Sequence, residues 1–92
     1  MNRQCTSILL LSARGYRRNG LQRVDLFWSG SSAHGFAVYR DGERIATVSA
    51  SPYHDKLDRG GSDVYRYHVS ETATAACSND AAVTFREPGR WR

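Results

Sequence analysis

The stretch that decides the fold is Val38-Tyr39-Arg40-Asp41-Gly42, followed later by Tyr53-His54-Asp55 and by Val64-Tyr65-Arg66-Tyr67-His68-Val69. Tyrosines recur at every second position of the last run, and period 2 is typical of a half-buried β-strand. Asp41-Gly42 stands between two apolar alternating runs and is a strong signal for a two-residue hairpin turn. These stretches therefore predict β-strands joined by tight turns.

The same pattern extends in both directions along the chain. Val24, Leu26 and Trp28 alternate with polar or oppositely directed neighbours, and Asn19-Gly20 before them predicts a second tight hairpin. Leu9 and Leu11 also alternate, although Leu10 blurs that pattern. No window carries a helical apolar pattern over three turns. The chain is expected to be all-β, a sandwich of about seven antiparallel strands in two sheets.

Six short motifs, in this order and spacing, resemble a fibronectin type III-like domain of the kind appended to bacterial secreted proteases and glycoside hydrolases. The motifs are residues 26–30, 39–42, 53–55, 65–69, 77–79 and 83–85. The resemblance implies a fibronectin type III or immunoglobulin-like β-sandwich over residues 8–86, after an N-terminal extension (1–7) and before a flexible C-terminal tail (87–92). It also implies that Trp28 fills the core and that Tyr65 is a corner tyrosine bonded to upstream backbone.

The chain has two cysteines, Cys5 and Cys77. In similar modules the second cysteine often pairs with one seven residues earlier, where this chain has Ser70. The resemblance places the start of the first strand and the loop before the last strand at the same pole, so a Cys5–Cys77 bridge is one expectation. It would contribute about 4 kcal/mol by constraining the unfolded chain. Two free thiols are the alternative.

The charge balance is basic, at +4 from 13 Lys+Arg and 9 Asp+Glu, and all but one of the bases are Arg. Arginine binds phosphates and carboxylates with two parallel hydrogen bonds. The bases are scattered among acids, however, which also fits an ordinary solvated surface. Arg17 and Arg18, in the first hairpin, are the candidate contacts for a polyanion or nucleic acid.

Three aromatic residues are candidate contacts with a partner or ligand: Phe27, Tyr39 and Trp91. Period 2 directs Phe27 and Tyr39 away from their buried neighbours. Exposed aromatics on a β-surface can pack against a neighbouring domain or stack on sugar rings. They can also be incidental, because a small sandwich leaves some apolar surface exposed.

Nothing in the sequence signals catalysis. His34, His54 and His68 occur without the local motifs of hydrolases or zinc enzymes, and no calcium loop or phosphate loop is present. No cofactor, metal or catalytic residue is therefore predicted, and no apolar run is long enough for a membrane span. The expectation is a monomeric, non-catalytic accessory, spacer or protein-interaction module. The resemblance implies attachment to a secreted or cell-surface enzyme; carbohydrate binding and weak polyanion binding are the alternatives.

Overall fold

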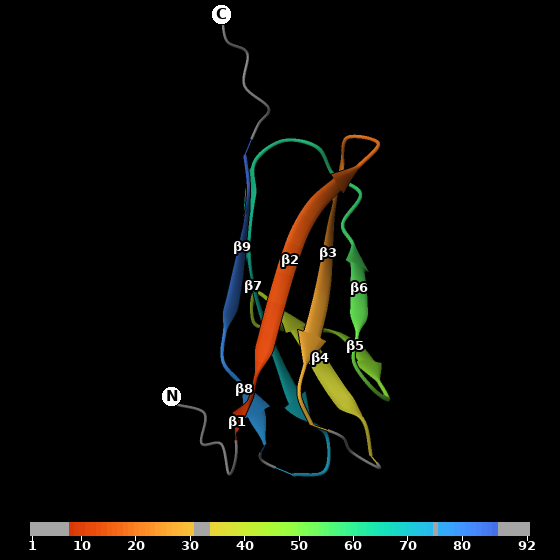
Figure 1. Cartoon of the computed structure of the whole chain (residues 1–92), viewed down its shortest axis with the longest axis vertical. Coiled ribbons are helices and arrows are strands. Elements are labelled where there is room, and N and C mark those ends of the chain that lie inside the picture. Colours follow the sequence, from red (N-terminus) through yellow and green to blue (C-terminus); the bar gives the residue numbers. More distant parts are fainter. Residues whose placement is uncertain (1–7, 31–33, 75, 87–92) are drawn as a thin grey trace, which may run out of the picture.

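The computed structural model describes residues 8–30, 34–74 and 76–86. These residues form nine β-strands and no helix (Figure 1). The strands are β1 (Ile8–Leu9), β2 (Leu11–Arg18), β3 (Leu21–Trp28), β4 (Phe36–Arg40), β5 (Glu43–Val48), β6 (Tyr53–Lys56), β7 (Asp63–Glu71), β8 (Cys77–Ser78) and β9 (Ala81–Phe85). The all-β prediction with two sheets is confirmed. The expected number of about seven strands is not, because two strands of only two residues, β1 and β8, are added.

The strands form two sheets. The smaller sheet has the order β2-β3-β6, and the larger has the order β1-β8-β7-β4-β5, with β9 paired to β7. All pairs are antiparallel except β1 with β8. In Figure 1 the strands β2 and β3 pass in front of β7 and β4. The inner faces of the two sheets enclose a single core.

Both predicted hairpin turns are present. Asn19 and Gly20 have φ of 55° and 81° between β2 and β3, and Asp41 and Gly42 have φ of 53° and 85° between β4 and β5. Asparagine, aspartate and glycine tolerate this left-handed region, which matches the twist of the flanking strands. Each turn fixes the register of its hairpin, so that Arg18 faces Leu21 in the first.

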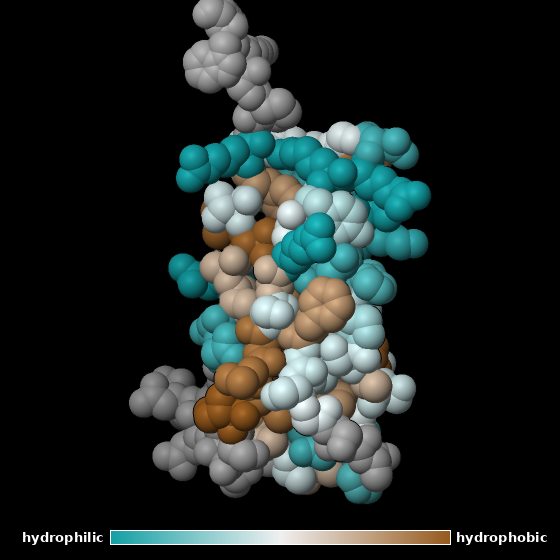
Figure 2. Space-filling view, in the orientation of Figure 1, coloured by the Kyte–Doolittle hydropathy of each residue, from teal (hydrophilic) through white to brown (hydrophobic). Residues whose placement is uncertain are grey.

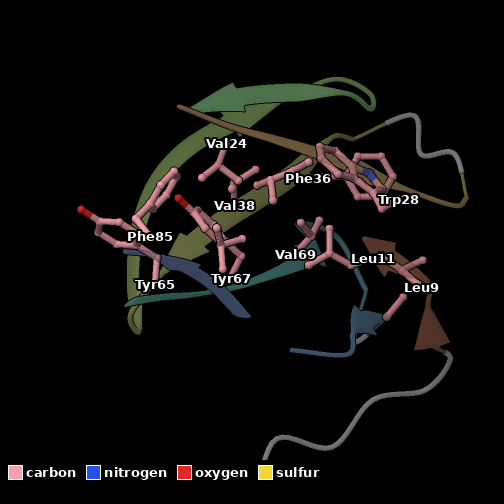
Figure 3. Packing of buried hydrophobic residues seen from close by; sticks show 13 residues of the cluster. Leu9, Leu11, Val24, Trp28, Phe36, Val38, Tyr65, Tyr67, Val69 and Phe85 are labelled. Atoms are coloured by element: carbon pink, nitrogen blue, oxygen red, sulfur yellow. The ribbon is translucent and has the colours of Figure 1, made fainter. Parts of the chain in front are cut away.

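The core contains the apolar side chains that alternation had placed inward (Figure 3). Trp28 packs edge-on against Phe36, with ring centroids 5.6 Å apart. Tyr65 and Phe85 make a similar contact at 6.1 Å near the other end. Such aromatic pairs stabilise beyond the area they bury. Trp28 is therefore a core residue, as the sequence predicted.

Leu10 marks the point where the chain changes sheets. Leu9 and Leu11 are buried, whereas Leu10 is 70% exposed between β1 in the larger sheet and β2 in the smaller. The Ser29 side chain accepts a hydrogen bond from the Leu10 N–H, and Asn79 bonds both backbone groups of Leu11. The interruption at Leu10 thus has a structural cause.

Gly15 allows the edges of the two sheets to approach. A Cβ built on Gly15 would lie 2.5 Å from Val83 Cγ1 and 3.1 Å from Phe85 Cζ. Since real Cβ atoms do not come this close to neighbours, any larger residue would push β2 away from β9. Gly15 closes this side of the sandwich.

The structure also bears on the cysteine alternatives. Cys77 is disulfide-bonded, so the alternative that both cysteines are free thiols is wrong for Cys77. Cys5 lies outside the described residues, and its pairing with Cys77 stays a prediction. Ser70 lies opposite Cys77 in the β7–β8 pair.

Candidate ligand-binding face

The outward side chains of the small sheet form one continuous surface, here called the basic face. The strand register arranges them in rows across β2, β3 and β6. From one end to the other the rows are Ser12 and Phe27; Arg14, Asp25 and His54; Tyr16, Arg23 and Lys56; and Arg18 and Leu21. Paired residues in antiparallel strands share a face and lie about 5 Å apart, so the members of a row are close neighbours.

Four cations and one carboxylate belong to the basic face. Arg23 lies 3.3 Å from Asp58, in the loop after β6. Among the described residues, Arg14, Arg18 and Lys56 have no hydrogen-bond or ion-pair partner for their side chains. Figure 2, which views this side of the molecule, shows hydrophilic side chains gathered toward the end that carries the β2–β3 turn. The basic face therefore carries positive charge that the described part of the protein does not neutralise.

The single carboxylate of the basic face, Asp25, is bonded to two neighbouring side chains. Asp25 Oδ1 lies 2.7 Å from His54 Nδ1 and accepts a hydrogen bond from the Tyr16 hydroxyl at 3.3 Å. These contacts orient the imidazole so that its Nε2 lies on the side away from Asp25. The His54 side chain is 58% exposed and thus adds an accessible polar group to the face.

Phe27 supplies the exposed aromatic group of this face, and Leu21, at the other end, is its second exposed apolar residue. Phe27 is 42% exposed and lies in the end row opposite Ser12. The ring of Tyr16 is half-buried and its hydroxyl is bonded, so Phe27 is the more accessible aromatic of the two. An apolar ring beside unpaired cations is a combination that can bind ligands carrying both apolar and anionic groups.

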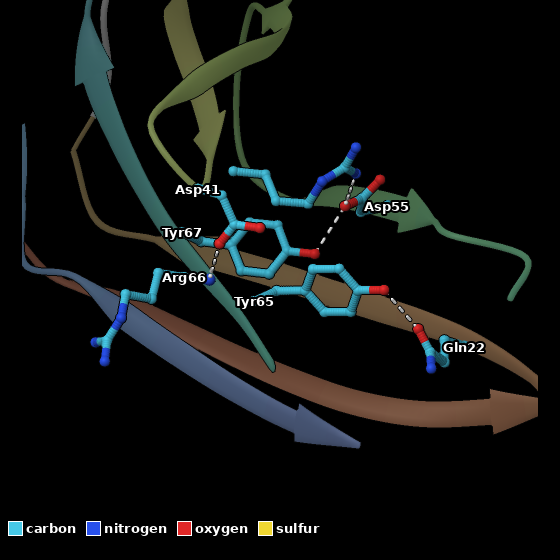
Figure 4. A network of polar contacts seen from close by, with 7 residues as sticks. Gln22, Asp41, Asp55, Tyr65, Arg66 and Tyr67 are labelled. Atoms are coloured by element: carbon cyan, nitrogen blue, oxygen red, sulfur yellow. Dashed lines mark hydrogen bonds and ion pairs between the residues drawn. The ribbon is translucent and has the colours of Figure 1, made fainter. Parts of the chain in front are cut away.

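The inner side of the same sheet holds a second polar cluster (Figure 4). Asp55, only 6% exposed, accepts hydrogen bonds from the Tyr67 hydroxyl and from Arg40 Nη1, both at 2.7 Å. Nearby, the Tyr65 hydroxyl donates to Gln22 Oε1 at 2.8 Å, and Gln22 is fully buried. Because unpaired buried polar groups are costly, these bonds are needed for the sheets to pack.

Burial also changes the ionisation of these tyrosines. Burial raises the pKa of Tyr67 far above its usual value, and the bond to Asp55 raises it further. Burial likewise raises the pKa of Tyr65. Both hydroxyls remain neutral donors. The expectation for Tyr65 is corrected in one respect: its partner is the side chain of Gln22, not upstream backbone.

The outer face of the larger sheet differs. Tyr39 and His68 stack with centroids 4.5 Å apart, so one face of the Tyr39 ring is covered. A hollow of about 400 Å³ lies beside them, lined by Asp41, Gly42, Arg66, Tyr67, His68 and Asp80. Asp41 is joined to Arg66 by two hydrogen bonds, one in each direction, so the hollow lies where the β4–β5 turn is held against β7.

The residues singled out from the sequence are not brought together. Phe27 and Arg18 lie on the basic face, whereas Tyr39 lies on the opposite side of the sandwich. Trp91 lies outside the described residues. Arg17 points inward at the sheet edge: its Nη2 donates to the carbonyls of Gly61 and Arg86, and its guanidinium lies 5.5 Å from the Phe85 ring centroid.

Sequence reasoning missed Arg14, Arg23, His54 and Lys56 as members of one surface. A signal for part of it was present. Because the Asn19-Gly20 turn fixes the hairpin register, Arg14 must face Asp25 and Tyr16 must face Arg23. The alignment of β6 beside β3 had no such signal, since the two strands are far apart in the chain.

Within the described ranges, no three His, Cys, Asp or Glu residues are grouped in a way that could hold a metal ion. Nor do these ranges contain a helix with the length and apolar character that crossing a membrane requires. Comparisons of the chain with protein families, curated proteins and solved structures give no match.

Proposed function

We propose that this chain is a fibronectin type III-like sandwich that acts as a non-catalytic binding module. Seven strands are longer than two residues, and their distribution supports the proposal. The first, second and fifth of them (β2, β3 and β6) share one sheet, and the third, sixth and seventh (β4, β7 and β9) share the other, as in immunoglobulin-like sandwiches. The fourth, β5, pairs with the third, β4. An accessory role beside a secreted or cell-surface enzyme is part of this proposal.

The module binds an acidic ligand or partner through the basic face. The observation that carries this proposal is the row register, which gathers Arg14, Arg18 and Lys56 from two strands without a neutralising partner in the described structure. Uncompensated charge on a rigid sheet attracts anions and steers their approach. A scaffold held by two packed sheets presents these groups at fixed spacing.

Chromatography on immobilised dextran sulfate, eluted with a salt gradient, tests this proposal. The variant R14Q/R18Q/K56Q removes three charges from the basic face. The matched control R44Q/R59Q/R66Q removes three charges from other strands and loops and leaves the same net charge. Circular dichroism and tryptophan fluorescence establish that both remain folded.

We expect the basic-face variant to elute at clearly lower salt than the control. Three exposed charge contacts together contribute about 2 kcal/mol, a factor of about 30 in affinity. Equal elution of the two variants would show that binding follows net charge alone and would overturn the proposal.

A further inference from the structure

We infer that the ligand of the basic face is an acidic polysaccharide, a chain of sugars that carry carboxylates. This inference rests on the proposed function and names the chemistry of the ligand. It combines two features that the register places side by side, an exposed aromatic ring and a series of cations.

The dimensions of the face favour a narrow, extended ligand. Strands of eight residues and a width of three strands give roughly 27 Å by 14 Å, from spacings of ~3.4 Å per residue and ~4.8 Å per strand. Because β6 has only four residues, the projected area is below about 400 Å², less than half of the ~800 Å² that each partner buries in a standard protein interface. A second copy of this chain does not fit either, because symmetric pairing would bring like charges together.

Phe27 is suited to one sugar ring. The apolar C–H face of a pyranose can lie on an exposed aromatic ring, and the neighbouring Ser12 hydroxyl can bond a sugar hydroxyl. A single-stranded nucleic acid stacks successive bases on several aromatics. On the basic face, by contrast, the Phe27 ring is exposed, whereas the Tyr16 ring is half-buried and its hydroxyl is bonded to Asp25.

The cations lie where the carboxylates of such a chain would fall. One row from Phe27, about 7 Å along the strands, Arg14 and His54 flank the occupied Asp25. Lys56 lies in the next row and Arg18 in the row after it. A sugar stacked on Phe27 directs its carboxylate to Arg14, while His54 Nε2 can accept a hydrogen bond from a sugar hydroxyl. The carboxylates of the following sugars meet Lys56 and Arg18. Arginine is well matched to carboxylate because it can donate two parallel hydrogen bonds.

Isothermal titration at low salt tests the inference with four probes: polygalacturonate, neutral dextran, poly-L-glutamate and an oligothymidylate. The variants are Phe27→Ala, Phe27→Trp and, as a control for an exposed apolar residue on the other sheet, Val64→Ala. Val64 is 57% exposed, so its replacement has little effect on folding.

We expect polygalacturonate to bind more tightly than the other three probes. Phe27→Ala should weaken this binding about tenfold, the loss of one good aromatic contact, while Phe27→Trp and Val64→Ala retain it. Equal or tighter binding of poly-L-glutamate or oligothymidylate would overturn the polysaccharide inference and leave the proposed function standing. An unchanged affinity of Phe27→Ala for polygalacturonate would likewise overturn the polysaccharide inference and leave the proposed function standing. If none of the anionic probes binds, both the inference and the proposed function fail.

Discussion

Two clusters of similar composition lie on opposite sides of the small sheet. On the inner side, Asp55 accepts hydrogen bonds from Tyr67 and Arg40; on the outer side, Asp25 is bonded to Tyr16 and His54. His54 and Asp55 are consecutive residues of β6, and alternation alone sends them to different clusters. Each cluster joins an aspartate, a tyrosine and a basic side chain.

The difference between them is burial, and burial decides the role. In the inner cluster the bonds replace lost hydration, so each partner is needed for packing. In the outer cluster the side chains of His54 and Asp25 are 58% and 19% exposed, so water can replace a lost partner and the bonds contribute less to stability. Tyr16, Asp25 and His54 are therefore not needed for the two sheets to pack.

The largest effect is expected when Asp55 is replaced by Ala. Tyr67 and Arg40 would lose their shared acceptor inside the sandwich, and removing one member of such a buried group costs about 3 kcal/mol. Urea denaturation measures the change. The control is His54→Ala, at the adjacent position on the outer side, which should change the free energy of unfolding by less than about 0.5 kcal/mol. Similar losses in the two variants would contradict the contrast between the clusters.

The next effect contrasts the two sides of β2. Gly15→Ala places a methyl group against Val83 and Phe85, and overpacking of this kind costs about 2 kcal/mol. Ser12→Ala, on the outer side of the same strand, should be close to neutral. Thermal unfolding of the two variants provides the comparison; an unchanged midpoint in Gly15→Ala would mean that β2 and β9 are not in close contact.

A third effect depends on pH. Burial raises the pKa of Tyr67 above its unfolded value of about 10, so the folded state binds the phenolic proton more tightly than the unfolded state does. The contribution of Tyr67 is therefore fully present below pH 10 and declines as pH rises above it, by up to about 1.4 kcal/mol per pH unit.

Urea denaturation at pH 9, 10 and 11 measures this decline. Tyr67→Phe should be less stable than the parent at pH 9, because Asp55 loses a donor, but its stability should fall less between pH 10 and 11. Parallel declines in the two proteins would refute the role given to Tyr67.

The smallest effect is expected from a change in the outer cluster. Asp25→Asn removes the only carboxylate of the basic face and should tighten binding of an acidic ligand about twofold, with little change in stability. Glu43→Gln removes one negative charge at the start of β5, in the other sheet, and is the matched control. The comparison fails if Glu43→Gln tightens binding as much as Asp25→Asn does.

Much of the fold could be predicted because its signals are local. Asn19-Gly20 and Asp41-Gly42 specify their turns through backbone conformation, and Trp28 follows from alternation along one strand. The two short strands could not be predicted. β1 and β8 pair across most of the chain length, and their two residues each carry no periodic signal.

The candidate site was only partly predictable, because it depends on which strands lie side by side. Phe27 and Arg18 were found from alternation and charge. Arg17 was expected to be a surface contact, but it lies on the same inward side of β2 as Leu11. Its side chain bonds the carbonyls of Gly61, just before β7, and Arg86, just after β9. Lys56 and His54 belong to the basic face because β6 pairs with β3. This pairing is set by the packing of the whole core.

The most direct test of the basic face is a nuclear magnetic resonance titration of the ¹⁵N-labelled chain with oligogalacturonate. We expect the largest amide shifts in β2, β3 and β6, at rows containing Phe27, Arg14 and Lys56, while β4, β5 and β7 change little. Shifts centred on β4, β5 and β7, or no shifts at a large excess of the oligosaccharide, would contradict it.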